Sequence, residues 1–381
     1  MDDDVNDDQR LLLDATARFI EQACPLGRVR DQAYDDPGFA GAYRRQAGEL
    51  GWYSFVVPAE LGGGSVSGDG VVDAALVAYH RGRHLQPGPF VGTNVVAHAL
   101  AAAGSDEHRA KVLPSLMSGE CSAAWAISAP PRGVALDGVA RATATAQGYR
   151  LTGRATFVED PGPGGWVLIV AATDEGLSQF LVPTSGPGAR VERLGSLDIS
   201  RRFVEVHLDG AELPSSALVG RPGGAAELVA VELALACVLT AAESVGAMDY
   251  ELGLTVQYAK DRIAFGRPIG SFQGIKHPLA DTSLNLEMSK AVTLAAARHL
   301  AAGDPYGVQA ASMAKAFVGD CGIDLAQTCF QVFGGIGFTW EHDQHLYLRR
   351  LTSDAALYGD PTWHRERLCQ LGALSGEVTE Q

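Results

Sequence analysis

Two glycine-rich segments near the carboxyl end of the chain carry the residues best suited to bind phosphate. Residues 262–281 read RIAFGRPIGSFQGIKHPLAD, and residues 331–350 read QVFGGIGFTWEHDQHLYLRR. In the first segment, the pattern predicts a helix that stops at Gly266, with Arg262 on its last turn and free to bind a phosphate bidentately. In the second, paired glycines let backbone amides approach a ligand. Both segments predict a pyrophosphate site, unless Arg262 forms a salt bridge to a neighbouring helix and the glycines only make a turn.

The sequence lacks the motifs of several other chemistries. It holds no GxGxxG between a strand and a helix, no Gly-Lys-Ser/Thr after its glycine-rich loop, no HExxH and no GxSxG. We therefore expect neither a Rossmann fold nor a metal site.

The composition favours a cytoplasmic globular protein. The chain has 381 residues and a net charge of −15, so its average surface repels nucleic acid. The six cysteines lie far apart, and the acidic start MDDDVNDD is unlike a signal peptide, so we expect free thiols in a reducing compartment. Residues 225–242 are apolar enough to span a bilayer, but Glu227 and Glu232 would be costly in lipid. This stretch predicts a buried helix rather than a membrane span.

Hydrophobic periodicity divides the chain into three parts. Apolar residues return every three or four positions up to about residue 118, which predicts helices. Short β-branched runs separated by Gly and Pro follow up to about residue 220. Helical periodicity then predicts long helices over residues 225–262, 278–302, 308–333 and 342–357. We therefore predict an α+β multidomain fold: an N-terminal helical domain (residues 1–119), a central antiparallel β-barrel-like domain (120–222) and a C-terminal four-helix bundle (223–381).

The two phosphate-binding segments, together with VPAELGG at residues 57–63, resemble the acyl-CoA dehydrogenase family, and the similarity covers nearly the whole chain. The resemblance implies a three-domain flavoprotein, usually a dimer of dimers, that dehydrogenates an acyl-CoA between its α and β carbons. In that family FAD lies between subunits. The flavin ring rests on one chain, and the pyrophosphate and adenosine are held by its neighbour. The matching positions for this second role are Arg262, Phe265, Gln331, Gly334 and Gly335.

The positions that would support the flavin ring depart from the family pattern. Residues 128–130 read Ser-Ala-Pro where the family has Thr-Glu-Pro, and residues 131–134 read Pro-Arg-Gly-Val where Gly-Ser-Asp is usual. Residues 157–159 read Phe-Val-Glu in place of Trp-Ile-Thr, so that Glu159 stands where a hydroxyl usually bonds the flavin. A negative charge there opposes the charge that the flavin gains on reduction.

The catalytic base of the family is also missing. Removal of the α-proton requires a buried carboxylate with a raised pKa. The family places this glutamate in a Tyr-Glu-Gly turn or on the first long helix of the last domain, and the matching positions here are Gly359 and Ala236. Two substitutes stay open: Glu232, four residues before Ala236 on the same helix face, and Asp360, beside the vacated turn position. Glu232 also fits an interface or solvent-facing charge, and Asp360 fits the cap of a helix that begins near Pro361.

The altered positions all belong to the half of the site that one subunit builds, whereas the phosphate-binding half is intact. Our leading hypothesis is therefore a subunit of a heteromeric FAD-dependent acyl-CoA dehydrogenase that completes the FAD site of a homologous catalytic chain. It resembles the non-catalytic subunits of actinobacterial enzymes for steroid or other bulky acyl side chains, with an electron-transferring flavoprotein as acceptor. Two alternatives stay open: a self-sufficient homomeric dehydrogenase that uses Asp360 or Glu232, and a flavin-free scaffold that binds a partner protein.

Overall fold

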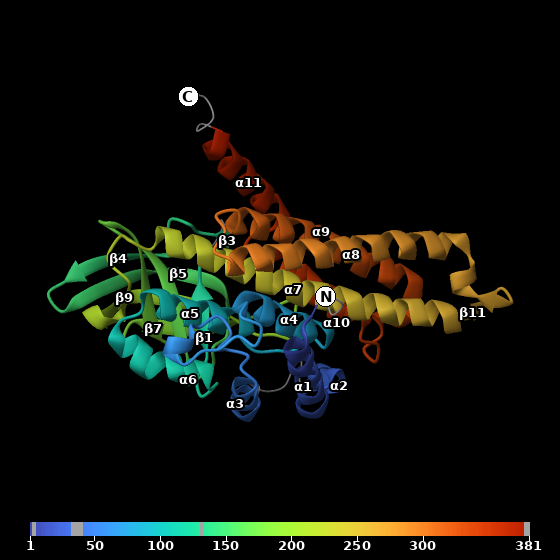
Figure 1. Ribbon diagram of the computed structural model, residues 1–381, viewed down its shortest axis with the longest axis horizontal. Helices are drawn as coiled ribbons and strands as arrows, with labels where there is room; N and C mark the ends of the chain where they lie inside the picture. Colours follow the sequence, from blue (N-terminus) through green and yellow to red (C-terminus); the bar gives the residue numbers. More distant parts are fainter. Residues whose placement is uncertain (2–4, 32–40, 130–132, 377–381) are drawn as a thin grey trace.

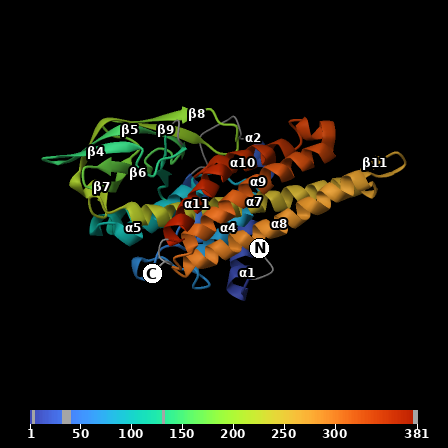
Figure 2. The ribbon, with the colours of Figure 1, turned by 90° about the horizontal axis from the view of Figure 1, so that it is seen from above.

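The computed structural model describes residues 1, 5–31, 41–129 and 133–376. The β strands gather at one end of an elongated molecule, and the long C-terminal helices run from beside the sheet to the other end (Figure 1). The N-terminal helices pack along these long helices, and α11 projects away from the body of the molecule (Figures 1 and 2). The order of helices, strands and helices is the predicted one.

The N-terminal part is helical and packs on the first long helix of the C-terminal part, α7 (Ala226–Asp261). Its helices are α1 (Asp7–Ala23), α2 (Leu26–Asp31), α3 (Gly41–Glu49), α4 (Gly70–Arg83), α5 (Phe90–Ala103) and α6 (Leu113–Met117), with a π-helical turn at His108–Val112 before α6. A capping box starts α1, because Asn6 Oδ1 accepts the Gln9 N–H at 2.8 Å and Gln9 Oε1 accepts the Asn6 N–H at 3.1 Å. Gly82 brings α4 close to α7, since a Cβ there would lie 1.8 Å from the carbonyl oxygen of Glu243.

The β domain is built on a mixed sheet. Its strands are β1 (Ala123–Ala126), β2 (Ser128–Ala129), β3 (Gly133–Val134), β4 (Ala140–Thr145), β5 (Gly148–Glu159), β6 (Trp166–Thr173), β7 (Gly176–Pro183), β8 (Ala189–Leu194), β9 (Phe203–Pro214) and β10 (Leu218–Val219). Among the described residues, the main sheet has eight strands in the order β10-β7-β6-β4-β5-β9-β8, with β1 also paired to β6. Because β6 runs parallel to both β1 and β4, the prediction of an antiparallel domain is wrong for these pairs. Alternating periodicity reports a strand but not the direction of its neighbour.

The C-terminal part consists of long packed helices. They are α7, α8 (Gln273–Ala301), α9 (Gly307–Phe333), α10 (Gln344–Ala356) and α11 (Pro361–Gly376). Helix α7 has 36 residues and is therefore about 54 Å long. It is long and apolar enough to cross a membrane, but most of its apolar stretch is buried inside the protein, as predicted. The predicted start of the second helix at Pro278 is wrong, since α8 begins at Gln273 and Pro278 lies inside it. As the sixth residue of α8, Pro278 leaves the Gly274 carbonyl without its intrahelical N–H partner, a position where proline normally kinks or ends a helix.

The segment after α7 also differs from its prediction. The helix ends at Asp261 rather than Gly266, and Arg262 follows it with an extended backbone. A two-residue hairpin pairs β11 (Ile263–Ala264) with β12 (Arg267–Pro268). Phe265 and Gly266 form its tip with φ angles of 52° and 78°, the left-handed conformation that tight hairpins require at both positions. Glycine adopts this conformation freely, and Phe265 is held in it by the hairpin.

Candidate functional site

The predicted phosphate-binding residues lie at the end of the helical domain that is far from the sheet (Figure 1). They are Arg262 directly after α7, Phe265 at the hairpin tip, Gln331 on the last turn of α9, and Gly334 and Gly335 in the short 3-10 turn that follows α9. The rings of Tyr258 and Phe333 pack with their centroids 4.8 Å apart and join the ends of α7 and α9. The structure thus brings the two predicted segments together.

This end of the molecule presents an open surface. The Phe265 side chain is 97% exposed, and Arg262 and Gln331 are exposed as well. Within the described part of the chain, the Arg262 guanidinium forms no ion pair. A Cβ placed on Gly334 or Gly335 would meet no atom within 4 Å, so the backbone at both glycines is accessible. The Gly334 N–H already caps α9 by donating to the Phe330 carbonyl, so what these turns offer the pyrophosphate of FAD is the exposed Arg262 guanidinium and a backbone that a ligand can approach closely.

The position that faces the flavin in the family holds a buried carboxyl group. Glu159 ends β5 and is 5% exposed, with its Oε1 3.8 Å from Arg201 Nη1. Its Oε2 has no hydrogen-bond partner in the described ranges. Burial raises the pKa of Glu159 to about 7, although Arg201 acts in the opposite direction. The group is therefore partly protonated at neutral pH, which weakens the full negative charge that the sequence predicted there.

The other flavin-facing positions are irregular. Phe157, at the family's tryptophan position, lies in a bulge between β5 and β9, with a φ of 52° and a side chain that is 59% exposed. Ser128 and Ala129 form the half-buried strand β2, paired to β3 at residues 133–134. Residues Pro130, Pro131 and Arg132 lie outside the described part of the chain.

Arg201 belongs to a buried ionic network that joins all three parts of the chain. Its guanidinium contacts Asp198 at 2.9 Å and Glu243 at 3.6 Å, and it also donates to Asp354. The network contains three guanidinium groups and four carboxyl groups. The extra carboxyl group favours retention of one proton on the acids, which agrees with the raised pKa of Glu159. The members are Arg81 on α4, Glu159, Asp198 and Arg201 in the β domain, Glu243 on α7, and Arg350 and Asp354 on α10. Sequence reasoning missed this network.

The usual position of the catalytic base is closed to a side chain. Gly359 has a φ of 105°, and a Cβ there would lie 2.6 Å from the Trp363 ring and 2.9 Å from His364 Nε2. Lys315, which is 2% exposed, donates from Nζ to the Gly359 carbonyl oxygen at 3.0 Å and to that of Ala355 at 2.9 Å. A glutamate at this position would therefore require the turn and its neighbours to move.

The second possible base position, Ala236, is fully buried in α7. The next residue, Cys237, has its Sγ 3.6 Å from His364 Nε2. Burial raises the pKa of the Cys237 thiol to about 11 and lowers the pKa of His364 to about 3. Both groups are neutral near pH 7, so this pair supplies neither a thiolate nor an imidazolium.

Glu232 is buried rather than solvent-facing. Its side chain is fully inaccessible and accepts a hydrogen bond from Gln179 Nε2 on β7. Burial raises the pKa of Glu232 well above its ordinary value. The contact joins α7 to the β domain, and no interaction recorded for the described residues links Glu232 to the turn that contains Gly359.

Asp360 is exposed and caps α11. Its Oδ1 accepts the backbone N–H of Trp363 at 2.8 Å, and Pro361 takes the first position of the helix. The capping geometry that the sequence predicted is therefore present. An exposed carboxylate lacks the apolar surroundings expected of the family's base.

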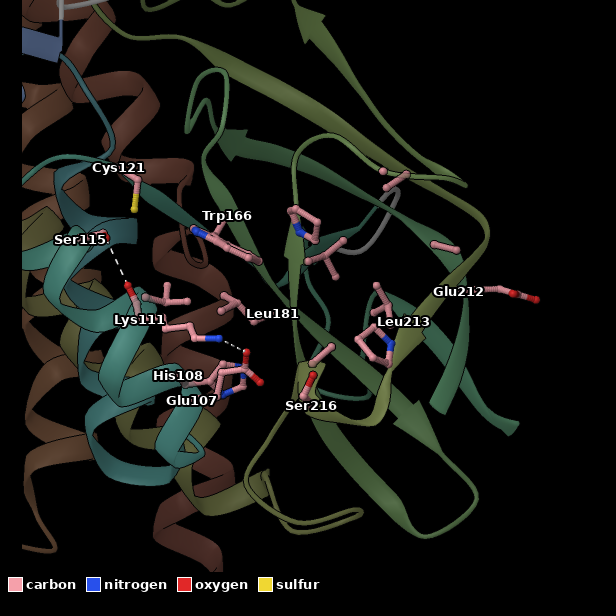
Figure 3. Close-up of a pocket in the computed structure, with 18 of the residues that line it drawn as sticks. Glu107, His108, Lys111, Ser115, Cys121, Trp166, Leu181, Glu212, Leu213 and Ser216 are labelled. Carbon is pink, nitrogen blue, oxygen red and sulfur yellow. Dashed lines mark hydrogen bonds and ion pairs between the residues drawn. The ribbon is translucent and has the colours of Figure 1, made fainter. Parts of the chain in front are cut away.

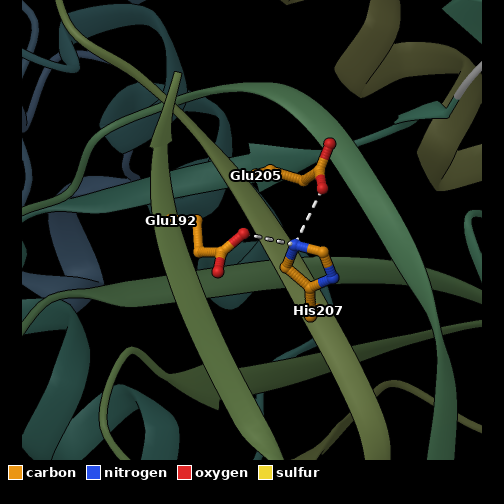
Figure 4. Close-up of side chains that lie close together, drawn as sticks. All are labelled: Glu192, Glu205 and His207. Atoms are coloured by element: carbon orange, nitrogen blue, oxygen red, sulfur yellow. Dashed lines mark ion pairs between the residues drawn. The ribbon is translucent and has the colours of Figure 1, made fainter.

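Two further features lie outside the predicted site. A cavity of about 580 Å³ opens between α6 and the β domain (Figure 3). On β8 and β9, His207 Nε2 lies 3.2 Å from Glu192 and 2.7 Å from Glu205, a grouping that could hold a metal ion (Figure 4). Arg154 pairs with Glu205 at 2.6 Å and Arg190 pairs with Glu192, so both carboxylates already have cationic partners.

Helices before and after a central mixed sheet define the acyl-CoA dehydrogenase fold. The family model described as acyl-CoA dehydrogenase, N-terminal domain matches residues 6–120, and the model of the C-terminal domain matches residues 226–370. The chain belongs to the acyl-CoA dehydrogenase family of oxidoreductases.

Known proteins resemble the chain over nearly its full length. Acyl-CoA dehydrogenase IpdE2 of Mycolicibacterium smegmatis is 30% identical over 370 residues, which cover 97% of this chain and 99% of the relative. The ChsE4–ChsE5 complex of Mycobacterium tuberculosis contains a chain that is 26% identical, with a TM-score of 0.86 and full coverage of both chains. PigA, solved with FAD and proline, shares the fold at 22% identity and a TM-score of 0.88, with 98% of this chain and all of that chain covered.

Proposed function

We propose that the chain is a subunit of a heteromeric FAD-dependent acyl-CoA dehydrogenase and completes the FAD site of a homologous catalytic subunit. The observation that carries the proposal is a contrast between two regions. The surface with Arg262 and the glycines after α9 is open and fits a dinucleotide. At the chain's own flavin-facing and base positions, Glu159 is engaged by Arg201 and Gly359 leaves no room for a side chain.

FAD, when bound, supplies the acceptor for the hydride that leaves the acyl-CoA. On this chain, Arg262 would neutralise pyrophosphate charge with paired N–H groups, and the glycines at 334 and 335 would let the cofactor approach the backbone closely. Phe265 exposes its whole ring at the hairpin tip and would pack against the cofactor or the partner chain. The partner would supply the carboxylate that takes the α-proton.

The partner and substrate follow from the same reasoning. The ChsE4–ChsE5 complex is an assembly of two named chains, and a similar pairing here would provide the missing half-site. We infer an acyl-CoA substrate with a bulky acyl group, such as a steroid side chain, and an electron-transferring flavoprotein as the acceptor. All six cysteines are free, which is compatible with the cytoplasmic location that we propose.

Measurement of the flavin content can also support one of two other functions, a homomeric enzyme or a flavin-free scaffold. A self-sufficient homomeric enzyme would need Glu232 or Asp360 as its base, and these are engaged by Gln179 and by the α11 backbone respectively. A flavin-free scaffold would leave the open Arg262 surface without a role. The heteromeric function requires neither an unusual base nor an unused phosphate site.

The test is the flavin content of the native assembly. The chain is purified alone and together with a homologous partner from the same genome, and FAD is measured by its absorbance. We expect one FAD per pair of unlike chains and little FAD on the chain alone. One FAD per subunit of a homomer that dehydrogenates acyl-CoA would contradict the proposal, and a colourless complex would favour the scaffold.

The variant Arg262→Ala tests whether Arg262 binds the pyrophosphate of FAD within the complex. Because charge-assisted hydrogen bonds contribute about 1.5–3 kcal/mol, loss of Arg262 should weaken FAD binding roughly tenfold to a hundredfold. Arg18→Ala is the matched control, since it removes an exposed arginine from α1 in the N-terminal part. Equal FAD affinity in the two variants would show that Arg262 does not hold the cofactor.

A further inference from the structure

The cavity beside α6 is separate from the flavin site. Its lining comes from residues 107–121 and from the ends of β6, β7, β8 and β9, together with residues 186–187 and 216–217. None of the lining residues belongs to α7, to α9 or to the turn that contains Gly359. Figure 3 shows helical residues on one side and the β domain on the other, with the cavity between them. A molecule bound there would not contact the phosphate-binding end of the chain.

The walls of the cavity are mostly apolar. Trp166 and Leu181 lie beside the helical wall, and Leu213 lies on the far side (Figure 3). The volume of about 580 Å³ falls within the range of roughly 300–1,000 Å³ that is typical of small-molecule sites. Such a space favours a compact apolar molecule.

One wall of the cavity is a π-helical turn, an irregularity that is frequent at functional sites. The turn spans His108–Val112, and both of these end residues line the cavity. It places His108, a 5% exposed imidazole, at the helical wall. Pro114 follows the turn and has no N–H to donate to the Ala110 carbonyl, which gives a local reason for the π-helical geometry; its consequence is that His108 lies in the wall of the cavity.

His108 offers a single hydrogen-bond donor to the cavity. Burial lowers the pKa of His108, so its ring is neutral near pH 7. Its Nδ1 accepts the backbone N–H of Ser105 at 3.3 Å, and the ring proton therefore resides on Nε2. In the described part of the chain, no recorded hydrogen bond uses this Nε2–H. The group is available to an acceptor on a ligand.

The charges around the cavity disfavour an anion. Lys111, the lysine of the lining, is already paired with Glu107 at 2.8 Å, and Glu212 is paired with Arg150 at 2.8 Å. A carboxylate or phosphate on the ligand would therefore find no unpaired lysine or arginine in the lining. An uncharged carbonyl oxygen meets the Nε2–H without this cost.

We propose that this cavity binds a neutral, largely apolar molecule whose carbonyl oxygen accepts a hydrogen bond from His108 Nε2. The apolar body lies against Trp166 and Leu181, and the carbonyl points to the π-helical turn. The site belongs to this chain alone and does not depend on the proposed sharing of FAD.

Two rigid probes that differ by one carbonyl test the proposal. 9-Fluorenone is neutral and apolar with one carbonyl oxygen, and fluorene is the same ring system without it. Each is titrated into the full chain in its native assembly, and affinity and stoichiometry are measured by calorimetry. We expect one saturable site per chain that prefers fluorenone by about twofold to tenfold, the range of one hydrogen bond. The variant His108→Phe should lose this preference, whereas Ser105→Ala, which keeps the ring and the Ser105 N–H, should retain it.

A filling variant separates the cavity from non-specific apolar binding. Ser115 lines the cavity from α6, and Ser115→Phe should reduce binding of both probes at least tenfold. Ala102→Phe adds the same ring to an exposed position on α5 that does not line the cavity, and it should bind as the wild type does. Absence of saturable binding, or full binding by the Ser115→Phe variant, would overturn the site. An unchanged preference for fluorenone in the His108→Phe variant would overturn the role of His108.

Discussion

The guanidinium of Arg201, in the β domain, donates a hydrogen bond to the carboxylate of Asp354 on α10, and both side chains are almost completely buried. This contact joins two parts of the chain that are more than 150 residues apart in sequence. Through Glu159, the same guanidinium also reaches the flavin-facing position. The network that holds the three parts together therefore includes Glu159, which stands at the position where the family has a hydroxyl group that bonds the flavin.

Removal of one partner of this pair should be strongly destabilising. The variant Arg201→Gln removes the cation that Asp354, Asp198 and Glu159 share in the interior, and such losses cost about 3–5 kcal/mol. The free energy of unfolding is measured by urea denaturation. The control is Arg150→Ala, whose ion pair with Glu212 is more than half exposed on both sides and should contribute at most about 1 kcal/mol. Similar losses in the two variants would mean that the network does not stabilise the fold.

The closed turn at Gly359 predicts that the family's base cannot be restored by one substitution. The variant Gly359→Glu must adopt a φ of 105° and displace Trp363, which should cost roughly 1–3 kcal/mol from the backbone alone and more from overpacking. We expect a lowered Tm and no acyl-CoA dehydrogenation by the isolated chain. Gly253→Ala is the control, because a Cβ there meets no atom within 4 Å on α7 and should raise stability by about 0.5–1 kcal/mol. Dehydrogenation by the Gly359→Glu chain alone would show that only the base was missing.

The parts of the fold that could be predicted are those that short stretches of sequence determine, such as helix periodicity and helix caps. The long helices follow from 3.6-residue periodicity, and the start of α11 follows from Asp360 and Pro361 in adjacent positions. The same rule failed at Pro278, which lies inside α8 although proline in a helix interior is normally unfavourable. It failed again after Asp261, where a two-residue hairpin with a phenylalanine at its tip carries no Asn-Gly or Asp-Gly signal.

The site could be predicted only where its residues are close in sequence. The glycines after α9 and the Arg262 segment are continuous motifs, and their exposure needed no long-range information. The network around Arg201 draws on residues from Arg81 to Asp354, each of which resembles an ordinary surface charge in the sequence. Buried ion pairs depend on tertiary contacts, which a single sequence does not report.

Glu251 predicts a pH dependence of stability. This fully buried carboxyl group on α7 bonds to Gln344, and burial raises its pKa from 4.5 to about 8. Between about pH 4.5 and 8 the folded state keeps a proton that the unfolded state has lost, so Glu251 lowers stability progressively as the pH rises, with no further loss above about pH 8. The variant Glu251→Gln keeps an acceptor for Gln344 and removes the titration. We expect its Tm to match that of the wild type near pH 5 and to exceed it by several degrees near pH 8. Each kcal/mol of unfolding free energy corresponds to a Tm shift on the order of 2–4 °C. A Tm difference that does not change with pH would contradict the raised pKa.

Asp360 can be assigned as a helix cap or as a base by comparing two substitutions. Asp360→Asn keeps a side-chain oxygen for the Trp363 N–H, whereas Asp360→Ala removes it and should cost about 1 kcal/mol of stability. A cap therefore predicts a clear drop in Tm for Asp360→Ala and nearly wild-type stability for Asp360→Asn, with acyl-CoA dehydrogenation by the assembled complex unchanged in Asp360→Asn. A base predicts loss of dehydrogenation in both variants, because neither the amide of Asp360→Asn nor the methyl group of Asp360→Ala can accept the α-proton, although the helix is intact in Asp360→Asn. Loss of dehydrogenation in a stable Asp360→Asn complex would assign Asp360 to the chemistry and favour the homomeric alternative over a shared site.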